Sequence, residues 1–397
     1  MLVGIADLAA RDADQIEDAL DAEHWASTIL GMMHAAPLPP GEDVATTFLP
    51  GFLAGLEDLG TRKALATLRA LAAVSAPDYA DAAGAAADRL AATGLRDAAW
   101  AADLGGARPT AAALRYEDAF DDGLSVMVDF AAANDATHTI GIYIDHNLGG
   151  LVKDVFLAGP LGEVRGQMSR TAPNQVGVAI RDLDLAEARA RAEAAFTMLD
   201  HTWDPPVNED VRSLRRALID ARLRLLPEGF ELSDDHVEAT PAEREALLDD
   251  FLSSPEGRRW RGDEDAEDVA HLAIEFGAGY NYGGPLRWSP VVVEIFMTSW
   301  LARKATRAHG FFERVPDVLR DWVNYAGRRR RVPSPPLREA VAAVEEYTEE
   351  MLAAVDDPEA WGPAKTIAVA ALDAGVDLSD LDQLQRFIDH YNEGLAA

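Results

Sequence analysis

The residues best suited to chemistry lie in one short run, Asp145-His146-Asn147, which is followed by Gly149-Gly150 and by Lys153-Asp154. An aspartate and a histidine side by side at the end of a strand can bind a metal, or can act as a base and the group that orients it. We therefore take Asp145, His146 and Asp154 as candidate catalytic residues. The same run also suits a hairpin turn, because Asn and Gly tolerate positive φ and Asp bonds its own backbone.

A second candidate site lies further along the chain, where Glu267, His271 and Glu275 follow one another at four-residue spacing. On a helix this spacing places the three side chains on one face, where they could bind one divalent metal ion. A solvated acidic face that contains a histidine is the alternative interpretation. We expect no cofactor, with a divalent metal as the alternative.

The third candidate is the segment Gly277–Pro285, which is rich in glycine and aromatic residues. Tyr280, Asn281 and Tyr282 are candidates for lining a pocket, although the segment also suits a tight connection between two helices. It lacks the Gly-Lys-Ser/Thr pattern of a phosphate-binding loop.

One basic cluster stands out, Arg328-Arg329-Arg330-Arg331. The chain as a whole carries 68 acidic and 36 basic residues, a net charge of −32. Such a surface repels nucleic-acid phosphate, so nucleic-acid binding is unlikely for this protein. The charge favours a basic protein partner; compositional bias with a solvated surface is the alternative explanation. The oligomeric state is not readable from the sequence.

The composition narrows the chemistry further. There is no cysteine, which excludes disulfides, thiolate metal sites and a cysteine nucleophile. The first residues lack a basic stretch and a long apolar run, and no stretch reaches the ~18 apolar residues of a membrane span. We therefore expect a cytoplasmic protein without membrane contact.

These candidates must be positioned by an α+β fold that is predominantly helical. We expect an N-terminal helical segment (1–108), a small antiparallel sheet (109–183) and a C-terminal helical domain (184–397). Alternating apolar residues predict strands at 124–130, 138–145 and 151–158, and a fourth near 175–181. The links between them are too short for parallel crossovers.

Helix signals flank this sheet on both sides. Thr61 and Pro77 suit helix starts, and Asp184 and Thr240 each precede a glutamate at capping-box spacing. A helix over 291–304 is apolar nearly all round, so we expect it to be buried at the centre of the C-terminal domain. One helix is predicted over 337–355, and two more close the chain.

Three stretches of the chain resemble a known family. They are Asp145–Asp154, Trp288–Lys304 and Pro316–Arg330. From about Thr61 to its end, the chain is similar to a set of uncharacterised actinobacterial cytosolic proteins of unknown function, some of which resemble segments that accompany plasmid-encoded ORF-3-like domains. The resemblance implies an actinobacterial origin and no known activity, so no functional residue is carried over.

Two functions remain open. The leading hypothesis is a non-enzymatic interaction or regulatory protein. It rests on the acidic surface and on the fact that a structural explanation accounts for each candidate catalytic motif better than a catalytic one. The alternative is a metal-dependent hydrolase or related small-molecule enzyme that uses histidine and carboxylate ligands.

Overall fold

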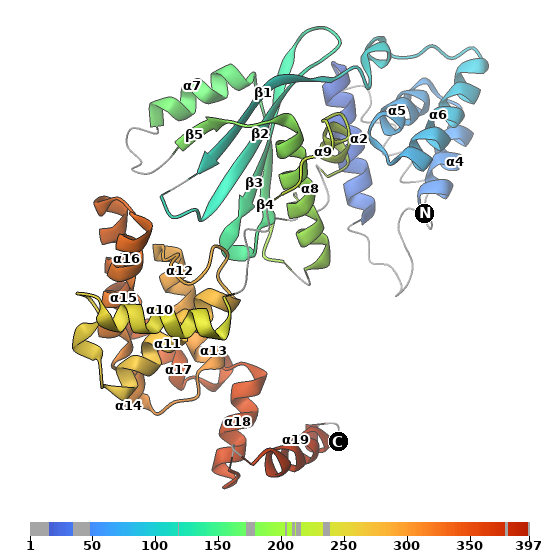
Figure 1. Ribbon diagram of the computed structural model, residues 1–397. Helices are drawn as coiled ribbons and strands as arrows, with labels where there is room; N and C mark the ends of the chain where they lie inside the picture. Colours follow the sequence, from blue (N-terminus) through green and yellow to red (C-terminus); the bar gives the residue numbers. More distant parts are fainter. Residues whose placement is uncertain are drawn as a thin grey trace.

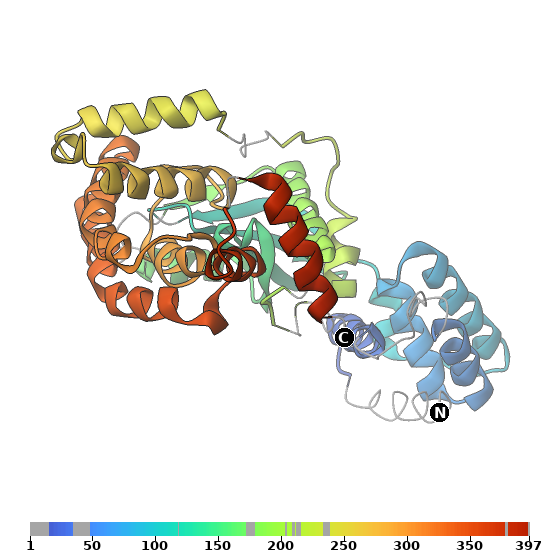
Figure 2. The same cartoon turned by 90° about the horizontal axis from the view of Figure 1, so that it is seen from below.

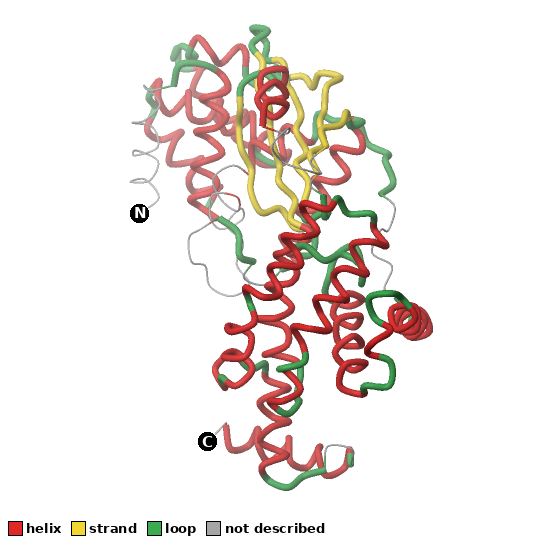
Figure 3. The backbone as a smooth tube through the Cα atoms, turned by 90° about the vertical axis from the view of Figure 1, so that its left-hand side faces the viewer, coloured by secondary structure: helices red, strands yellow, loops and turns green. Residues whose placement is uncertain are grey.

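The computed structural model describes residues 16–34, 48–117, 119–171, 179–202, 205–208, 211, 216–232, 239–377 and 380–395. The fold is α+β and mostly helical, with one antiparallel sheet (Figure 1). The N-terminal helices lie beside this sheet, and further helices pack against its faces. The larger, C-terminal group of helices lies at one end of the sheet (Figures 1 and 3).

The N-terminal helices form a core of small and apolar side chains. They are α2 (Ala19–His34), α4 (Leu49–Leu59), α5 (Arg62–Val74) and α6 (Pro77–Ala92), followed by the 3-10 turn η2 (Ala99–Asp103). Thr61 caps α5 by accepting a hydrogen bond from the Ala64 N–H at 3.1 Å, and Pro77 begins α6, as the sequence predicts. Alanines on α6 bury against α5, which allows close helix packing.

The sheet has five strands in the order β4-β3-β2-β1-β5, all antiparallel to their neighbours. They are β1 (Arg108–Glu117), β2 (Gly123–Ala131), β3 (Thr137–Asp145), β4 (Leu151–Ala158) and β5 (Ala179–Asp182). The three strands predicted from alternation are confirmed as β2, β3 and β4. The predicted fourth strand overlaps β5, although residues 175–178 lie outside the described residues. Strand β1 was not predicted.

Two helices cover the two faces of the sheet. Helix α8 (Leu185–His201) packs on one face, where its alanines and Phe196 meet Val126, Val128 and Phe130 of β2. Helix α7 (Leu161–Thr171), which was not predicted, packs on the other face beside Met127. The buried carboxylate of Asp129 accepts a hydrogen bond from the Leu161 N–H at 3.2 Å, so the sheet itself fixes the start of α7.

The short helix α9 (Arg216–Leu223) packs against α2 and α5. Its Leu218 and Ala221 belong to the core of the N-terminal helices. Helices α8 and α9 both fall within the predicted C-terminal range 184–397, yet they contact the sheet and the N-terminal helices. The apolar side chains of α8 and α9 therefore pack against the sheet and the N-terminal helices, which precede them in the chain.

The remaining helices follow in the second half of the chain, and those between residues 241 and 356 build a separate core of large aromatic and aliphatic side chains. They run from α10 (Pro241–Ser253) and α11 (Glu264–Gly279) through α12 (Pro290–Glu294), η7 (Ile295–Trp300), α13 (Leu301–Lys304), α14 (His309–Phe312) and α15 (Val315–Arg330) to α16 (Ser334–Glu346), α17 (Thr348–Asp356), α18 (Pro363–Asp373) and α19 (Leu381–Leu395), with 3-10 turns η6 (Arg258–Trp260) and η8 (Pro358–Ala360).

The predicted helix over 291–304 corresponds to α12, η7 and α13 in direct succession. Phe296, Met297 and Leu301 are fully buried, as expected of a central element. Its middle is π-helical, which the sequence did not predict. The single helix predicted over 337–355 is wrong, because the chain breaks at Tyr347 into α16 and α17. Among the described helices none has both the length and the apolar content of a membrane crossing.

The sheet and the C-terminal helices meet through loops. Phe120, from the turn between β1 and β2, is 8% exposed and belongs to the core of the C-terminal helices. In Figures 1 and 3 these helices lie at one end of the sheet, with α18 and α19 farthest from it. Figure 2 shows α19 on the outside of the same group.

Candidate functional site

The turn between β3 and β4 carries the first predicted site. Asp145 ends β3, and its carboxylate accepts hydrogen bonds from the Asn147 N–H at 2.8 Å and from Lys153 Nζ at 2.7 Å. Gly149 and Gly150 follow with φ values of 77° and 83°, which favour glycine. Asp145 is buried, so its charge is balanced locally by Lys153 and by backbone dipoles.

A bulge in β4 brings Lys153 to this position. Tyr143 pairs with Asp154, but the next residue of β3, Ile144, pairs with Val152, so Lys153 is the extra residue. Asp154 is exposed on β4 and accepts a hydrogen bond from the Val155 N–H. It therefore lies apart from the buried groups of the turn.

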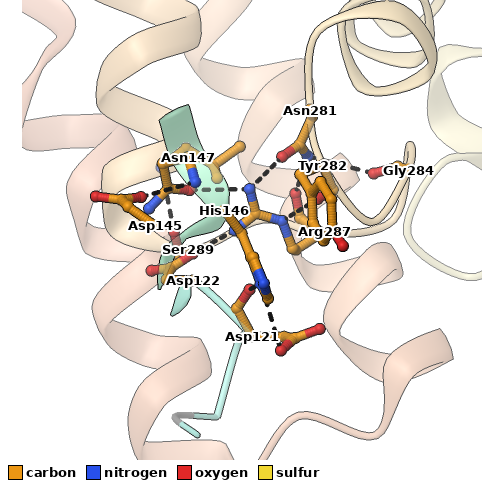
Figure 4. A network of polar contacts seen from close by, with 11 residues as sticks. Asp121, Asp122, Asp145, His146, Asn147, Asn281, Tyr282, Gly284, Arg287 and Ser289 are labelled. Carbon is orange, nitrogen blue, oxygen red and sulfur yellow. Dashed lines mark hydrogen bonds and ion pairs between the residues drawn. The ribbon is translucent and has the colours of Figure 1, made fainter. Parts of the chain in front are cut away.

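His146 is buried at this turn and is held on two sides. Its Nδ1 lies 2.8 Å from the carbonyl oxygen of Asp121, which can only accept, so Nδ1 carries the proton. The ring stacks on Tyr282 with centroids 4.3 Å apart (Figure 4). The Oδ1 atom of Asp121 is 3.6 Å from Nδ1, and the backbone of Asp121 has a φ of 62°.

The loop between α11 and α12 supplies the other side of the site. Gly277 is required near its start, because a Cβ there would lie 2.3 Å from Pro285 Cα. The Asn281 amide donates to the carbonyl oxygens of Gly284 at 3.2 Å and Arg287 at 2.6 Å, which closes the loop on itself. Ser289 then caps α12 by accepting a hydrogen bond from Val292.

Arg287 connects all of these elements. Its guanidinium donates to Asp122 Oδ1 at 2.5 Å, to Asn147 Oδ1 at 2.9 Å and to Asn281 Oδ1 at 2.6 Å, and its Nε donates to the Tyr282 carbonyl oxygen. The side chain is 1% exposed. Arg287 therefore ties the β1–β2 turn, the β3–β4 turn and the α11–α12 loop together (Figure 4). We call this group of residues the Arg287 junction.

The structure thus brings together Asp145, His146, Asn281 and Tyr282, which the sequence analysis treats as two separate candidates. Tyr280 does not join them: it is 56% exposed, and its ring contacts Trp300 and Lys304 instead. Sequence reasoning missed Arg287, Asp122 and Asp121. The only sign of Arg287 in the sequence is a single arginine inside a Gly- and Pro-rich loop. This sign is weak, because the sequence does not reveal that the two turns of the sheet lie beside the loop.

The predicted metal ligands lie elsewhere, on α11. His271 and Glu275 are exposed, and Glu267 Oε1 accepts a hydrogen bond from the Gly262 N–H at 2.7 Å. Within the ranges that the structure describes, no three histidine or acidic side chains, these included, form a group that could hold a metal ion. Asp268, on the same helix, pairs with Arg307.

Two of the four arginines at the end of α15 pair with acidic neighbours. Arg328 makes two hydrogen bonds to Glu256, at 2.8 and 3.0 Å, and Arg329 pairs with Asp250. The Arg328 pair lowers the pKa of Glu256, whose carboxylate therefore stays charged under mild acid. A phosphate ligand would have to compete with these acids, which argues against nucleic-acid binding here.

A second buried polar group lies between α2, β3 and α9, and no motif in the sequence indicated it. Arg222 pairs with Glu23 and donates to His138 Nε2 at 3.3 Å, and all three residues are buried. Burial, followed by the charge of Arg222, lowers the pKa of His138 to about 4, against a weaker opposing effect of Asp18. His138 is therefore neutral at pH 7.

Two cavities lie away from the Arg287 junction. One of about 50 Å³ lies beside His138, which is room for a few water molecules. The other, of about 380 Å³, lies between α8 and α9. Its Arg216 already pairs with Asp200 and Asp220, and burial raises the pKa of Asp220.

Comparison of the chain with family models, with curated proteins and with solved structures found no match. The actinobacterial resemblance stays a prediction.

Proposed function

We propose that this protein is a non-enzymatic interaction or regulatory protein of the cytoplasm that binds a basic protein partner. The observation that carries the proposal is the Arg287 junction. Two of the candidate catalytic residues, Asp145 and His146, are buried there and hydrogen-bonded to neighbouring groups, and Arg287 donates to three side-chain oxygens and one carbonyl oxygen.

A catalytic site needs groups that can reach a substrate. Asp145 is paired with Lys153, and the Nδ1 proton of His146 is directed at the protein backbone, with Tyr282 stacked against the ring. Such an arrangement suits a structural joint between the sheet and the C-terminal helices. The large acidic surplus of the chain then supports recognition of a partner through charge.

The test is recovery of partners from a cell lysate on the immobilised full chain at low salt. We expect basic proteins to be retained and to elute as the salt concentration rises, because screening weakens exposed charge pairs. A neutral chain of similar size on the same support controls for nonspecific retention. Recovery of nothing specific at low salt would contradict the proposal.

A metal-dependent hydrolase is the second candidate, and one observation favours it: the Asp145–His146 turn and the Asn281–Tyr282 loop converge from distant parts of the chain, as the parts of an active site do. Elemental analysis of the purified protein, with thermal unfolding in the presence and absence of divalent metals, tests this candidate. A bound metal or a raised unfolding temperature would support it, and a protein without either would remove it.

A further inference from the structure

The cavity of about 380 Å³ between α8 and α9 has the size of a small-molecule site, since such pockets measure about 300–1,000 Å³. The two helices lie side by side but belong to different cores (Figure 1). Helix α8 packs on the sheet, whereas Leu218 and Ala221 of α9 lie in the core of the N-terminal helices. A ligand held between α8 and α9 therefore contacts two separately built parts of the protein.

Each helix supplies apolar and polar side chains to the lining of this cavity. Phe196 of α8 and Leu223 of α9 are buried and form its apolar part. Glu193 and Thr197 of α8 are one turn apart, and both are exposed. The Thr197 hydroxyl donates to the Glu193 carbonyl oxygen at 2.8 Å, so its oxygen can still accept a hydrogen bond from a ligand.

Asp220 brings a negative charge that its neighbours compensate only in part. Its two carboxylate oxygens accept from the same atom, Arg216 Nε, at 2.9 and 3.0 Å. The other nitrogens of Arg216 donate to Asp200 at 3.0 and 3.1 Å, so one arginine serves two carboxylates. Burial raises the pKa of Asp220 in spite of the opposing charge of Arg216. A cationic group of a ligand would supply further positive charge here.

Glu193 shares its arginine in the same way. Arg189 Nε lies 2.8 Å from Glu193 Oε1, and Arg189 Nη2 lies 2.9 Å from Glu228 Oε1. Arg189 and Arg216 thus serve four carboxylates between them, two of which line the cavity. The acidic part of the lining therefore has an unmet demand for positive charge.

Arg224 adds a positive charge to the same lining. It follows Asp220 by one turn of α9, but its Nη2 donates to the carbonyl oxygens of Val74 and Ser75, at 3.5 and 3.1 Å. Among the described acidic side chains, none forms an ion pair with Arg224. Its other guanidinium N–H groups can therefore bind an anionic group of a ligand.

We propose that this cavity binds a free α-amino acid with an apolar side chain. Its ammonium group interacts with Asp220 and Glu193, its carboxylate pairs with Arg224, and its side chain contacts the apolar part of the lining. A zwitterion fits because the lining carries both signs of charge. It also has no net charge for the −32 of the chain to repel, unlike a simple anion. The inference goes beyond the proposed function and does not depend on it.

The experiment measures binding to the full chain by isothermal titration calorimetry, with leucine, valine and phenylalanine as probes. Leucinamide lacks the carboxylate of leucine, and N-acetylleucine lacks the ammonium group. We expect leucine to bind at least about tenfold more tightly than either derivative, because only leucine pairs with both signs of charge. Equal binding of leucine and leucinamide would overturn the proposal in favour of a simple cation site. Absence of binding by all three amino acids would also overturn it.

Variants locate the site. Arg224→Gln should weaken leucine binding about tenfold without weakening leucinamide binding, because it removes only the partner of the carboxylate. A loss of folding would weaken both probes alike, so the comparison separates the two causes. Glu193→Gln, at an exposed position, should weaken both probes, and the exposed control Arg338→Gln on α16 should leave both unaltered. Undiminished leucine binding by Arg224→Gln would overturn the proposal.

The two proposals fail separately. If basic lysate proteins are retained but no amino acid binds, the proposed function stands and this site is wrong. If leucine binds as expected but no lysate protein is retained specifically, this site stands and the proposed function is wrong.

Discussion

The ring of His146 stacks on the ring of Tyr282 with centroids 4.3 Å apart, although every element from β4 to α11 lies between the two residues along the chain. The contact joins the end of the sheet to the loop that leads into α12. Beneath it, Arg287 bonds to side chains from two turns of the sheet. This small set of loop residues fixes how the two parts of the protein fit together, so substitutions within it have testable effects on stability.

Replacement of Arg287 by Met is the most direct test of the junction. The variant removes the positive charge of Arg287 from beside the partly buried Asp122 carboxylate, and breaking a buried ion pair costs about 3–5 kcal/mol of the free energy of unfolding. Urea denaturation measures the difference. Arg328→Met is the matched control, since it breaks an exposed pair with Glu256, a kind of pair worth about 0–1 kcal/mol. Equal effects of the two variants would refute a structural role for the junction.

A substitution at Phe120 tests the apolar contact between the sheet and the C-terminal helices. Its side chain leaves the β1–β2 turn and fills a place in the core of the C-terminal helices. Phe120→Ala should lower the free energy of unfolding by about 3 kcal/mol, because it removes a buried ring and leaves a cavity. Phe230→Ala, at a 39% exposed position, should change it by less than about 0.5 kcal/mol under the same urea titration.

His138 should make stability depend on pH. Its pKa is about 4 in the folded protein and near 6.5 when unfolded, so between these values the unfolded chain binds a proton that the folded one does not. Stability therefore falls as the pH drops from about 6.5 to about 4, by up to roughly 3 kcal/mol from this group.

The variant His138→Gln isolates this contribution, because Gln can accept the hydrogen bond from Arg222 but does not titrate. Its unfolding free energy should fall less over that pH range than that of the native chain. Parallel curves for the native chain and His138→Gln would contradict the prediction.

Gly141 in β3 has a packing role that a double variant can reveal. A Cβ at this position would lie 2.0 Å from Phe156 Cζ, so the ring of Phe156 rests directly on the glycine backbone. Gly141→Ala should destabilise the protein by about 1–3 kcal/mol through overpacking. In the background Phe156→Ala the same change should cost much less. Additive costs in the double variant, measured by thermal and urea unfolding, would show that the two residues are independent.

Local patterns predicted much of this fold. Alternation located β2, β3 and β4, and the caps at Thr61 and Thr240 were predicted from single residues, the second as a reciprocal capping box. Strand β1 was missed because Ala111-Ala112-Ala113 has the composition of a helix, and its pairing with β2 overrides that preference. The break at Tyr347 was missed because the apolar periodicity continues across it.

The candidate site was predictable only in part. Each loop could be found from its own turn and glycine signals, but the sequence carries no sign that they meet. Arg287 and Asp122 form an ion pair, but they lie so far apart in the chain that no local sequence pattern indicates the contact. The same limit applies to Arg222 and Glu23, whose buried pair joins α9 to α2.

The bulge at Lys153 has a consequence beyond its hydrogen bond to Asp145. Strand β4 forms one edge of the sheet, and an unbroken edge is a template for pairing with strands of other molecules. The extra residue interrupts the backbone spacing of that edge and places a lysine on it. At the opposite edge, the described part of β5, Ala179–Asp182, carries the charged residues Arg181 and Asp182. The bulge at one edge and the charged side chains at both edges therefore disfavour strand pairing with other molecules.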